Sequence, residues 1–188
     1  MILDLLRHGE TVLGGGLRGS LDDALTPLGW TQMRQAVAGA GPWDVLVSSP
    51  LQRCGLFADE LGARLGLAVQ READVRELHF GDWEGRSAAQ IMQTEADALG
   101  LFWNDPYAFT PPGGEAVLAF AERVQAAVTR LACQYAGKRV LLVTHGGVMR
   151  LLLAQARGLP REQLLQVEVG HGALKRLVCE GDLLHEVD

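Results

Sequence analysis

Short apolar runs alternate along this chain with longer segments in which apolar residues recur every three or four positions. Residues 2–6 form such a run, which ends abruptly in polar residues, as a buried strand does where it enters a loop. Residues 51–65 show helical spacing instead, with an apolar stripe along one face. The same reasoning predicts strands at residues 2–6, 44–47, 140–143, 163–169, 173–179 and 183–187, and helices at residues 27–37, 50–65, 87–100, 116–135 and 148–156.

Two of the predicted helices begin with a hydroxyl residue followed by proline. Thr26-Pro27 and Ser49-Pro50 each offer an N-cap and a residue suited to the first helical position. The second helix therefore places Arg53 about one turn inside. From there its side chain can point back towards the end of the preceding strand.

Alternating strands and helices predict an α/β fold, a three-layer sandwich with a mostly parallel central sheet and helices on both faces. The length of 188 residues fits a single domain, residues 1–188, with a small lid region at about residues 87–115. In such sheets, ligands bind beyond the carboxyl ends of the strands. His8 follows the first predicted strand and His145 follows the strand at 140–143, so we expect both at that edge.

Composition and charge narrow the classes of partner. The net charge of −6 opposes binding of nucleic acid by a general basic surface. We expect neither a signal peptide nor a membrane span, because no basic leader and no long apolar run is present, and we therefore expect a cytoplasmic protein. Cys54, Cys133 and Cys179 are widely spaced, which favours buried free thiols in a reducing compartment. A homodimer is compatible with this sequence.

Side chains that can attack phosphorus, bind phosphate or donate a proton follow the predicted strands or open the predicted helices. An imidazole such as that of His8 is a nucleophile when one nitrogen is unprotonated and the other is held by a hydrogen bond. Arg53 suits phosphate, because its planar guanidinium donates parallel charge-assisted hydrogen bonds. Glu77 opens a segment rich in carboxylates and aromatics, where desolvation would favour a proton-donating carboxyl group. Residues 144–147 add a second imidazole and a helix start that favours anions.

Five motifs in fixed order resemble the histidine phosphatase superfamily, the phosphoglycerate mutase-like group. Any one of them is common in structural roles, but the five in order are far more specific. The resemblance covers about residues 2–173 and is most similar to the α-ribazole phosphatase branch. The motifs are Arg7-His8-Gly9-Glu10-Thr11, Ser49-Pro50-Leu51-Gln52-Arg53, Glu77-Leu78-His79-Phe80-Gly81-Asp82-Trp83-Glu84-Gly85, Pro112-Gly113-Gly114-Glu115 and Thr144-His145-Gly146-Gly147.

The resemblance implies a role for each matching residue. His8 matches the nucleophile that becomes phosphorylated, and Glu77 matches the carboxyl group that donates and then accepts a proton. Arg7, Arg53 and His145 match the pocket around the phosphate. Such a site needs no metal ion and no other cofactor, because two arginines and an imidazole neutralise the phosphate oxygens, and no carboxylate cluster in the sequence resembles a metal cage.

Four further positions are matched less closely. Gly146 stands where the family offers a backbone N–H to phosphate, and Arg18 is a weaker candidate for contact with substrate. At Gly14 relatives carry an asparagine, so one phosphate contact is absent here or comes from another group such as Arg18. His171 lies where relatives tend to carry an asparagine followed by small residues. A structural or surface role is the better expectation for it than a replacement contact.

The function implied by the resemblance is that of a phosphomonoester hydrolase with a phosphohistidine intermediate. Its expected substrate is a small-molecule phosphomonoester, α-ribazole 5′-phosphate of cobalamin biosynthesis. In the lid, Trp103, Tyr107 and Phe109 either stack on a planar base or pack the lid against the sheet. The alternatives are a broad-specificity small-molecule phosphatase, a phosphoglycerate mutase and a non-catalytic phospholigand-binding module. The short chain favours hydrolysis over a mutase, and the retained nucleophile and acid disfavour the binding module.

Overall fold

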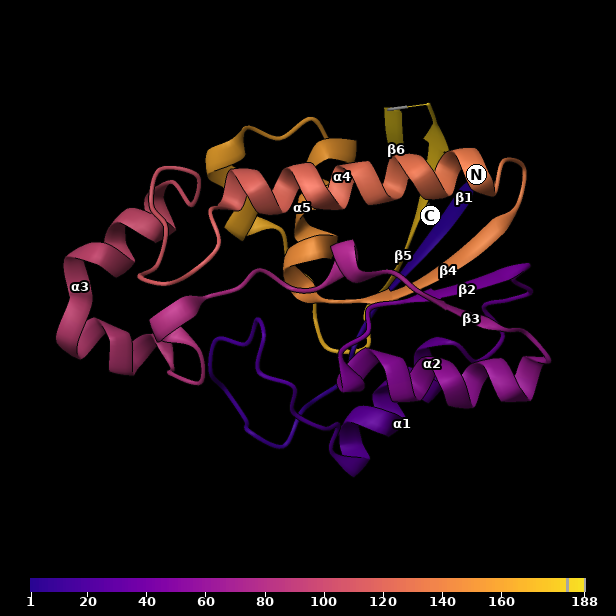
Figure 1. The fold of residues 1–188 in the computed structure, drawn as a ribbon, viewed down its shortest axis with the longest axis horizontal. Coiled ribbons are helices and arrows are strands. Elements are labelled where there is room, and N and C mark those ends of the chain that lie inside the picture. The colour runs from indigo at the N-terminus through magenta and orange to yellow at the C-terminus, as the bar shows by residue number, and fades with distance from the viewer. Residues whose placement is uncertain (182, 188) are drawn as a thin grey trace.

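Strands and helices alternate over most of the chain (Figure 1). The computed structural model describes residues 1–181 and 183–187. The strands are β1 (Ile2–Arg7), β2 (Val45–Ser48), β3 (Val69–Arg71), β4 (Arg139–Thr144), β5 (Leu174–Glu180) and β6 (Leu183–Val187). The α-helices are α1 (Pro27–Ala36), α2 (Gln52–Leu65), α3 (Ala88–Asn104), α4 (Val117–Gln134) and α5 (Gly146–Ala156), and the 3-10 turns are η1 (Ala73–Val75), η2 (Gly81–Trp83) and η3 (Arg161–Gln166).

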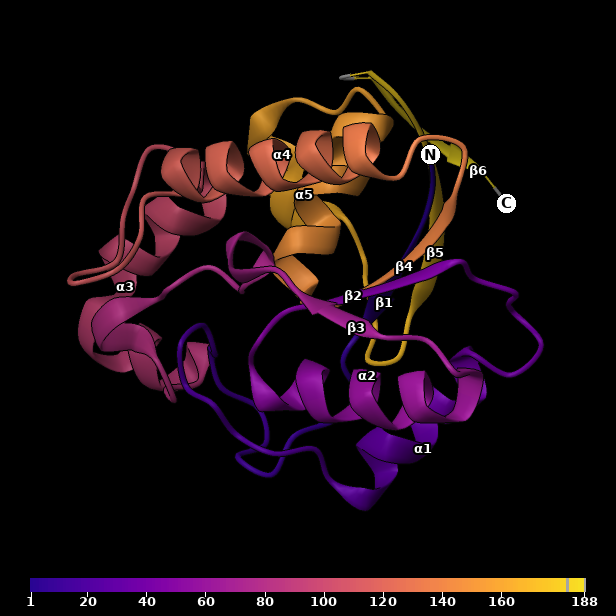
Figure 2. The same cartoon turned by 45° about the vertical axis from the view of Figure 1, so that its right-hand side comes forward.

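The strands form one sheet in the order β3-β2-β4-β1-β5-β6. Strands β1 to β4 are parallel, whereas β5 pairs antiparallel with β1, and β6 antiparallel with β5. Helices α1 and α2 lie on one face of the sheet, and α4 and α5 lie on the other (Figure 2). The predicted three-layer α/β sandwich with a mostly parallel sheet is confirmed.

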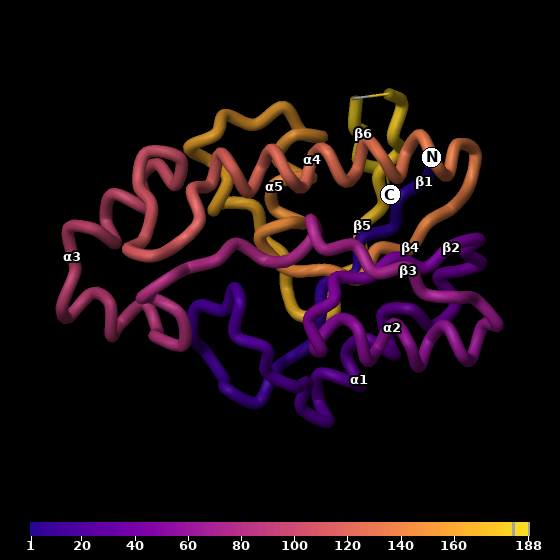
Figure 3. Tube along the Cα trace, in the orientation of Figure 1, coloured from indigo at the N-terminus to yellow at the C-terminus, as the bar shows by residue number. Residues whose placement is uncertain are grey.

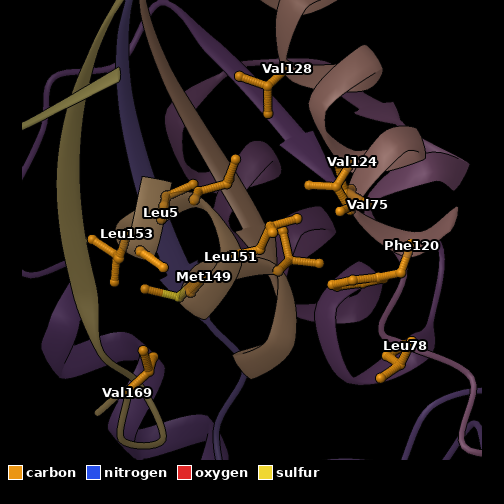
Figure 4. Packing of buried hydrophobic residues seen from close by; sticks show 14 of the residues in the cluster. Leu5, Val75, Leu78, Phe120, Val124, Val128, Met149, Leu151, Leu153 and Val169 are labelled. Carbon is orange, nitrogen blue, oxygen red and sulfur yellow. The ribbon is translucent and has the colours of Figure 1, made fainter. Parts of the chain in front are cut away.

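Burial on both faces explains why the central strands are continuously apolar. In β4, Val140 and Leu142 belong to the core under α4 and α5, whereas Leu141 and Val143 belong to the core under α1 and α2. Figure 4 shows the first of these cores, where Leu5 of β1 lies among side chains of α5. Each fully buried aliphatic side chain stabilises the fold by about 1.5–3 kcal/mol. A strand buried on both sides therefore has no polar alternation.

Helix α3 occupies the end of the molecule opposite the N-terminus, within the predicted lid region (Figure 3). Ser87 caps it by accepting from Gln90 N, and the Gln90 side chain reaches back to Ser87 N, which is a capping box. The helix continues to Asn104, four residues beyond the predicted end, and the backbone leaves helical geometry at Glu95. The predicted helix is confirmed with a displaced C-terminus.

Several sequence-based expectations about elements and burial are wrong. Residues 163–169 do not form a strand: the 3-10 turn η3 and the loop after it bury Leu164 and Val167 in the core shared with α5, so their apolar spacing reflects burial without strand pairing. Ser49 does not cap α2, whose N-cap is Leu51 without a side-chain hydrogen bond. Cys133 is exposed, whereas Cys54 and Cys179 are buried as expected.

Candidate active site

The register of the two central strands brings His8 and His145 together. Arg7 at the end of β1 pairs with Thr144 at the end of β4. The residue that follows each of them is a histidine, and the two ring centroids lie 5.4 Å apart. The predicted meeting of both imidazoles at the carboxyl edge of the sheet is therefore observed.

The His8 ring is held in one orientation and one tautomer. Its Nδ1 lies 2.8 Å from the carbonyl oxygen of Gly9, and because a carbonyl only accepts, Nδ1 carries the hydrogen. Nε2 then bears the lone pair. Burial lowers the pKa of His8 well below 6.5, and the charges of Arg53 and Arg7 lower it further. The ring is neutral at pH 7, with a nucleophilic nitrogen that has no protein partner among the described residues.

Gly9 is required by a close approach between β1 and α1. A Cβ on Gly9 would lie 2.1 Å from the carbonyl oxygen of Gly29, and a Cβ on Gly29 would lie 2.1 Å from that of Glu10. The two glycines let the loop after β1 pass directly over the first turn of α1. This contact fixes the carbonyl that orients His8.

His145 is fully buried, and the protein occupies both of its ring nitrogens. Arg53 Nε donates to Nδ1 at 3.3 Å, so Nε2 carries the hydrogen and donates to Ser49 Oγ at 2.7 Å. Burial lowers the pKa of His145 well below 6.5, and Arg53 contributes in the same direction. Ser49 was missed as a site residue, because Ser-Pro before a helical pattern predicts a cap. The contact that uses its hydroxyl spans 96 residues.

Arg53 is a fully buried arginine at the second position of α2, not one turn inside as predicted. Besides its bond to His145, it donates to the carbonyl oxygens of Leu21 at 2.5 Å and Gly19 at 2.9 Å. Three of its five N–H groups are thus used, and two remain. Its charge lies beside the imidazoles at a fixed position.

Arg7 lies at the end of β1 with part of its guanidinium free. Nη1 donates to the carbonyl oxygen of Val169 at 2.5 Å. Nε is buried and has no hydrogen-bond partner within residues 1–181 and 183–187. Burial lowers the pKa of Arg7 from its ordinary value, while the charge of Glu77 acts in the opposite direction. An unpartnered buried N–H next to His8 is a donor suited to an anion.

Arg18 and Asp23 form a buried pair that fastens the loop after β1. Arg18 Nε lies 2.8 Å from Asp23 Oδ2, an ion pair whose angle is not that of a hydrogen bond. Arg18 also donates to the carbonyl oxygens of Gly16 and Gly14. Asp23 is only 6% exposed, and its other oxygen faces Arg53. The predicted contact of Arg18 with substrate stays a prediction, and the protein itself occupies much of this guanidinium.

Glu77 links the third motif to the start of α5. Oε2 accepts from Gly147 N at 2.9 Å, and Oε1 accepts from Leu78 N at 3.0 Å. Each oxygen retains a further lone pair. A Cβ at position 147 would lie 2.2 Å from Glu77 Oε1, so only glycine allows this approach. The carboxyl group of Glu77 therefore lies at the N-terminus of α5, which begins at Gly146 directly after His145.

His79 and Glu84, from the same motif, hold loops together. Glu84 Oε1 accepts from Ser20 N at 2.7 Å and lies 2.7 Å from His79 Nδ1, and Oε2 accepts from Leu21 N at 2.7 Å. Burial raises the pKa of Glu84, but these hydrogen bonds outweigh burial and the net pKa is lowered. Both side chains therefore join the loop after β1 to the third motif.

A pocket of about 400 Å³ opens between Glu77, α3 and α5. Trp103 lines it, whereas Phe109 stacks on Trp83 and Tyr107 lies under Arg161. Only the first of the three lid aromatics therefore faces this space. The pocket is lined by Leu17, Glu77, Leu78, Phe80, Phe102, Trp103, Pro106, Val117, Phe120, Gly147, Arg150, Leu164, Leu165 and Gln166.

Arg150 is a cation of this pocket that the sequence did not single out. Its Nε donates to the carbonyl oxygen of Val167 at 3.0 Å. A Cβ on Gly146 would lie 3.1 Å from Arg150 Nη1 and 3.2 Å from Arg7 Nε, so the two guanidinium groups border the same glycine. Its place three positions after Gly147 on a helix was the only sequence signal.

Metal-ligand clusters and membrane-spanning helices are both absent from the described residues. Within residues 1–181 and 183–187, no three His, Cys, Asp or Glu side chains converge as ligands of a metal ion would. None of the helices in these ranges has the length and apolar character needed to cross a membrane.

Comparison with known proteins gives matches over most of the chain. The model of the histidine phosphatase superfamily (branch 1) matches residues 3–186. The glucosyl-3-phosphoglycerate phosphatase of Mycobacterium tuberculosis is 37% identical over 84% of this chain and 76% of its own length. The adenosylcobalamin/α-ribazole phosphatase of Escherichia coli is 32% identical over 92% of this chain and 87% of its own length.

Solved structures agree with the sequence matches. A mycobacterial glucosyl-3-phosphoglycerate phosphatase in complex with VO3 has a TM-score of 0.88 and 32% identity, covering 99% of this chain and 96% of its own. The α-ribazole phosphatase of Shigella flexneri has a TM-score of 0.86 and 29% identity, covering 100% of this chain and 95% of its own. Both similarities extend over the whole sheet and the site at its edge.

Proposed function

Because the chain belongs to the histidine phosphatase superfamily, branch 1, and is a phosphatase, we propose that it hydrolyses phosphomonoesters through a phosphohistidine on His8. One observation supports this mechanism above the others. The Gly9 carbonyl holds the His8 ring with Nδ1 protonated, which leaves an unprotonated Nε2 at the carboxyl edge of the sheet. A neutral, oriented imidazole of this kind needs no further activation to attack phosphorus.

The proposed first step transfers the phosphoryl group to His8. The lone pair on Nε2 forms a bond to phosphorus as the bond between phosphorus and the leaving oxygen breaks. Glu77, in its acid form, gives its proton to that oxygen. The buried N–H of Arg7, the remaining N–H groups of Arg53 and the start of α5 at Gly146 supply charge and donors for the phosphate oxygens.

The proposed second step releases phosphate. The carboxylate of Glu77 takes a proton from water, and the water oxygen attacks phosphorus while the bond to Nε2 breaks. His8 returns to its neutral form, and Glu77 returns to its acid form. His145 contributes by fixing Arg53 and Ser49 through its two ring nitrogens. The cycle uses no metal ion.

The pocket beside Glu77 supports α-ribazole 5′-phosphate as substrate. Its lining is mainly aliphatic and aromatic, and Trp103 is 46% exposed there. A planar dimethylbenzimidazole would gain from stacking on that indole and from leaving water. The similarity to α-ribazole phosphatases supports the same substrate.

Glucosyl-3-phosphoglycerate is a second candidate, and Arg150 is the observation that favours it. The leaving group of that substrate carries a carboxylate, and a guanidinium in the pocket could bind it as a bidentate partner. The similarity to the mycobacterial enzymes favours it too. A sugar acid would, however, leave most of the apolar lining without a matching surface.

The mechanism is tested by trapping the phosphoenzyme. Protein given labelled substrate, with EDTA present, should carry phosphate on His8 after quenching in alkaline detergent, and His8→Ala should carry none. EDTA should leave the rate unchanged, because arginines supply the charge. Label on another residue would contradict the nucleophile, and loss of activity restored by Mg²⁺ would contradict the metal-free cycle.

The substrate is tested by comparing kcat/KM for α-ribazole 5′-phosphate, glucosyl-3-phosphoglycerate and 3-phosphoglycerate. We expect the first to be preferred, and Trp103→Ala to lower its value by about 2- to 10-fold. Leu101→Ala is the matched control, since Leu101 is 57% exposed on the same helix and does not line the pocket. A preference for glucosyl-3-phosphoglycerate that Arg150→Ala abolishes would establish the second candidate instead.

A further inference from the structure

The turn that carries His171 is fastened to the end of β1. Arg7 N donates to the carbonyl oxygen of Ala173 at 2.9 Å, and Gly172 N donates to that of His8 at 3.3 Å. Gly172 has a φ of +68°, a conformation that residues with a side chain rarely adopt. These bonds hold the backbone of the turn against the nucleophile, so the position of His171 is fixed relative to His8.

His171 is a third imidazole at the site. Its ring centroid lies 5.8 Å from that of His8. The side chain of His171 is exposed. His145, the other imidazole that contacts the His8 ring, is fully buried. No hydrogen bond of either ring nitrogen of His171 occurs among the described residues. His8 thus has two imidazole neighbours. His145 uses both ring nitrogens in hydrogen bonds within the protein, whereas His171 is exposed to solvent and, within the part of the chain that is described, uses neither.

The loop after β1 leaves a donor position unfilled. Gly14 has no side chain, and Arg18 is held by Asp23 and by the carbonyl oxygens of Gly14 and Gly16. Neither side chain of this loop therefore offers a free donor to an anion on His8 Nε2, whereas His171 is exposed and its ring centroid lies 5.8 Å from that of His8.

We propose that His171 binds the substrate phosphate, its ring N–H donating to a phosphate oxygen from the solvent side. The inference rests on the proposed function in that it places the phosphate on His8. It assigns to this chain a phosphate contact from the turn before β5 in place of one from the loop after β1.

The charged groups that face His171 make this contact depend on pH. They are Arg7, Glu10, Arg18 and, on the nucleophile, His8. Partial desolvation of the ring against the protein and the charge of Arg7 lower the pKa of His171 below 6.5. At pH 7 the neutral ring offers one N–H, and as the pH falls through its pKa the ring becomes a cation and binds an anion more strongly.

Sulfate binding measured by calorimetry tests the contact without turnover. Sulfate keeps its charge between about pH 5 and pH 8, so changes in affinity report protein groups alone. We expect His171→Ala to weaken binding about 10-fold at pH 7, the size of a hydrogen bond to a charged group. The loss should grow as the pH falls. His171→Gln should recover most of the affinity at pH 7 and none of the additional affinity at low pH.

His185→Ala is the matched control, an exposed histidine on β6 away from the site. Sulfate affinity within twofold of the unmodified protein for His171→Ala at every pH, or no sulfate binding by the unmodified protein, would overturn the inference. A loss that is constant with pH and not recovered by Gln would show a structural effect and overturn it too. Sulfate binding through His171 in a protein that forms no phosphohistidine would contradict the proposed function alone.

Discussion

His8 and Glu77 differ in how the protein occupies their polar atoms. One nitrogen of His8 is fixed by a carbonyl and the other is free, which is what a nucleophile requires. Both oxygens of Glu77 accept a backbone N–H, from Gly147 and Leu78, yet each keeps a lone pair. At the residue scale, orientation is therefore built from main-chain groups of three separate motifs.

Glu77→Gln tests general acid catalysis. An alkoxide such as the ribose 5′-oxygen needs a proton as it leaves, whereas nitrophenolate does not. The loss on α-ribazole 5′-phosphate should be about 10²–10⁴-fold, with a much smaller loss in phosphorylation by p-nitrophenyl phosphate. Because water activation is lost as well, phosphohistidine should accumulate in a burst, measured by rapid quench.

The decisive quantity is the ratio of the phosphorylation rates with the two substrates in the same variant. Gln places an NH₂ against a backbone N–H donor and disturbs the site, and this disturbance affects both rates. Glu122→Gln, an exposed glutamate on α4, is the matched control and should leave the ratio unchanged. Equal slowing of both substrates without a burst would mean that Glu77 only shapes the pocket.

At the scale of elements, α1 is joined to β1 through a contact between glycines. In a helix interior, Gly→Ala is favoured by about 0.5–1 kcal/mol. At Gly29 the added Cβ would lie 2.1 Å from the Glu10 carbonyl oxygen, which is backbone and yields only if α1 moves. Steric conflict and propensity therefore oppose one another at this position.

We expect the steric contact to outweigh the gain in helix propensity, so that Gly29→Ala lowers the free energy of unfolding by about 1–3 kcal/mol. It should also lower kcat, because the displaced loop carries the Gly9 carbonyl that orients His8. Gly100→Ala on α3 is the control: its Cβ meets nothing within 4 Å, so it should raise the free energy of unfolding. Urea unfolding measures the free energy of unfolding of both variants. A Gly29→Ala variant that is more stable than the unmodified protein would contradict the close approach of Gly29 and Glu10.

At the scale of the whole molecule, two buried histidines link folding to pH. Burial lowers the pKa of both His8 and His145 well below 6.5, their ordinary value. Below pH 6.5 the unfolded chain binds protons that the folded protein does not, so stability rises with pH and is lost as the pH falls. For each histidine, this loss of stability extends from about pH 6.5, the pKa in the unfolded chain, down to the lower pKa in the folded protein. This pH range is the window of the effect.

Within that window the free energy of unfolding should fall by about 1.4 kcal/mol per pH unit for each histidine. Urea unfolding of the unmodified protein and of His145→Asn checks this. The variant should start less stable at pH 7, and its slope should be smaller by about 1.4 kcal/mol per pH unit within the window. Equal slopes would mean that His145 titrates normally in the folded protein.

The sequence by itself determined much of the secondary structure and the edge where the site forms. Thr26-Pro27 starts α1 because capping is a local interaction, with Thr26 accepting from Gly29 N at 3.0 Å. The apolar run at 140–143 indicated a strand because burial on both faces removes alternation. The imidazoles were placed correctly, since a residue that follows a parallel strand lies at its carboxyl edge.

The tertiary structure alone decided which partners the polar groups find. Ser49 contacts His145 across 96 residues, and the apolar residues of 163–169 bury in the core without a strand. Asp23 is buried between arginines, and His171 reaches His8 from a turn near the other end of the chain. Such contacts depend on strand order and register, which join segments far apart in sequence. Local patterning cannot encode them, because the energies of burial and pairing exist only once those segments meet.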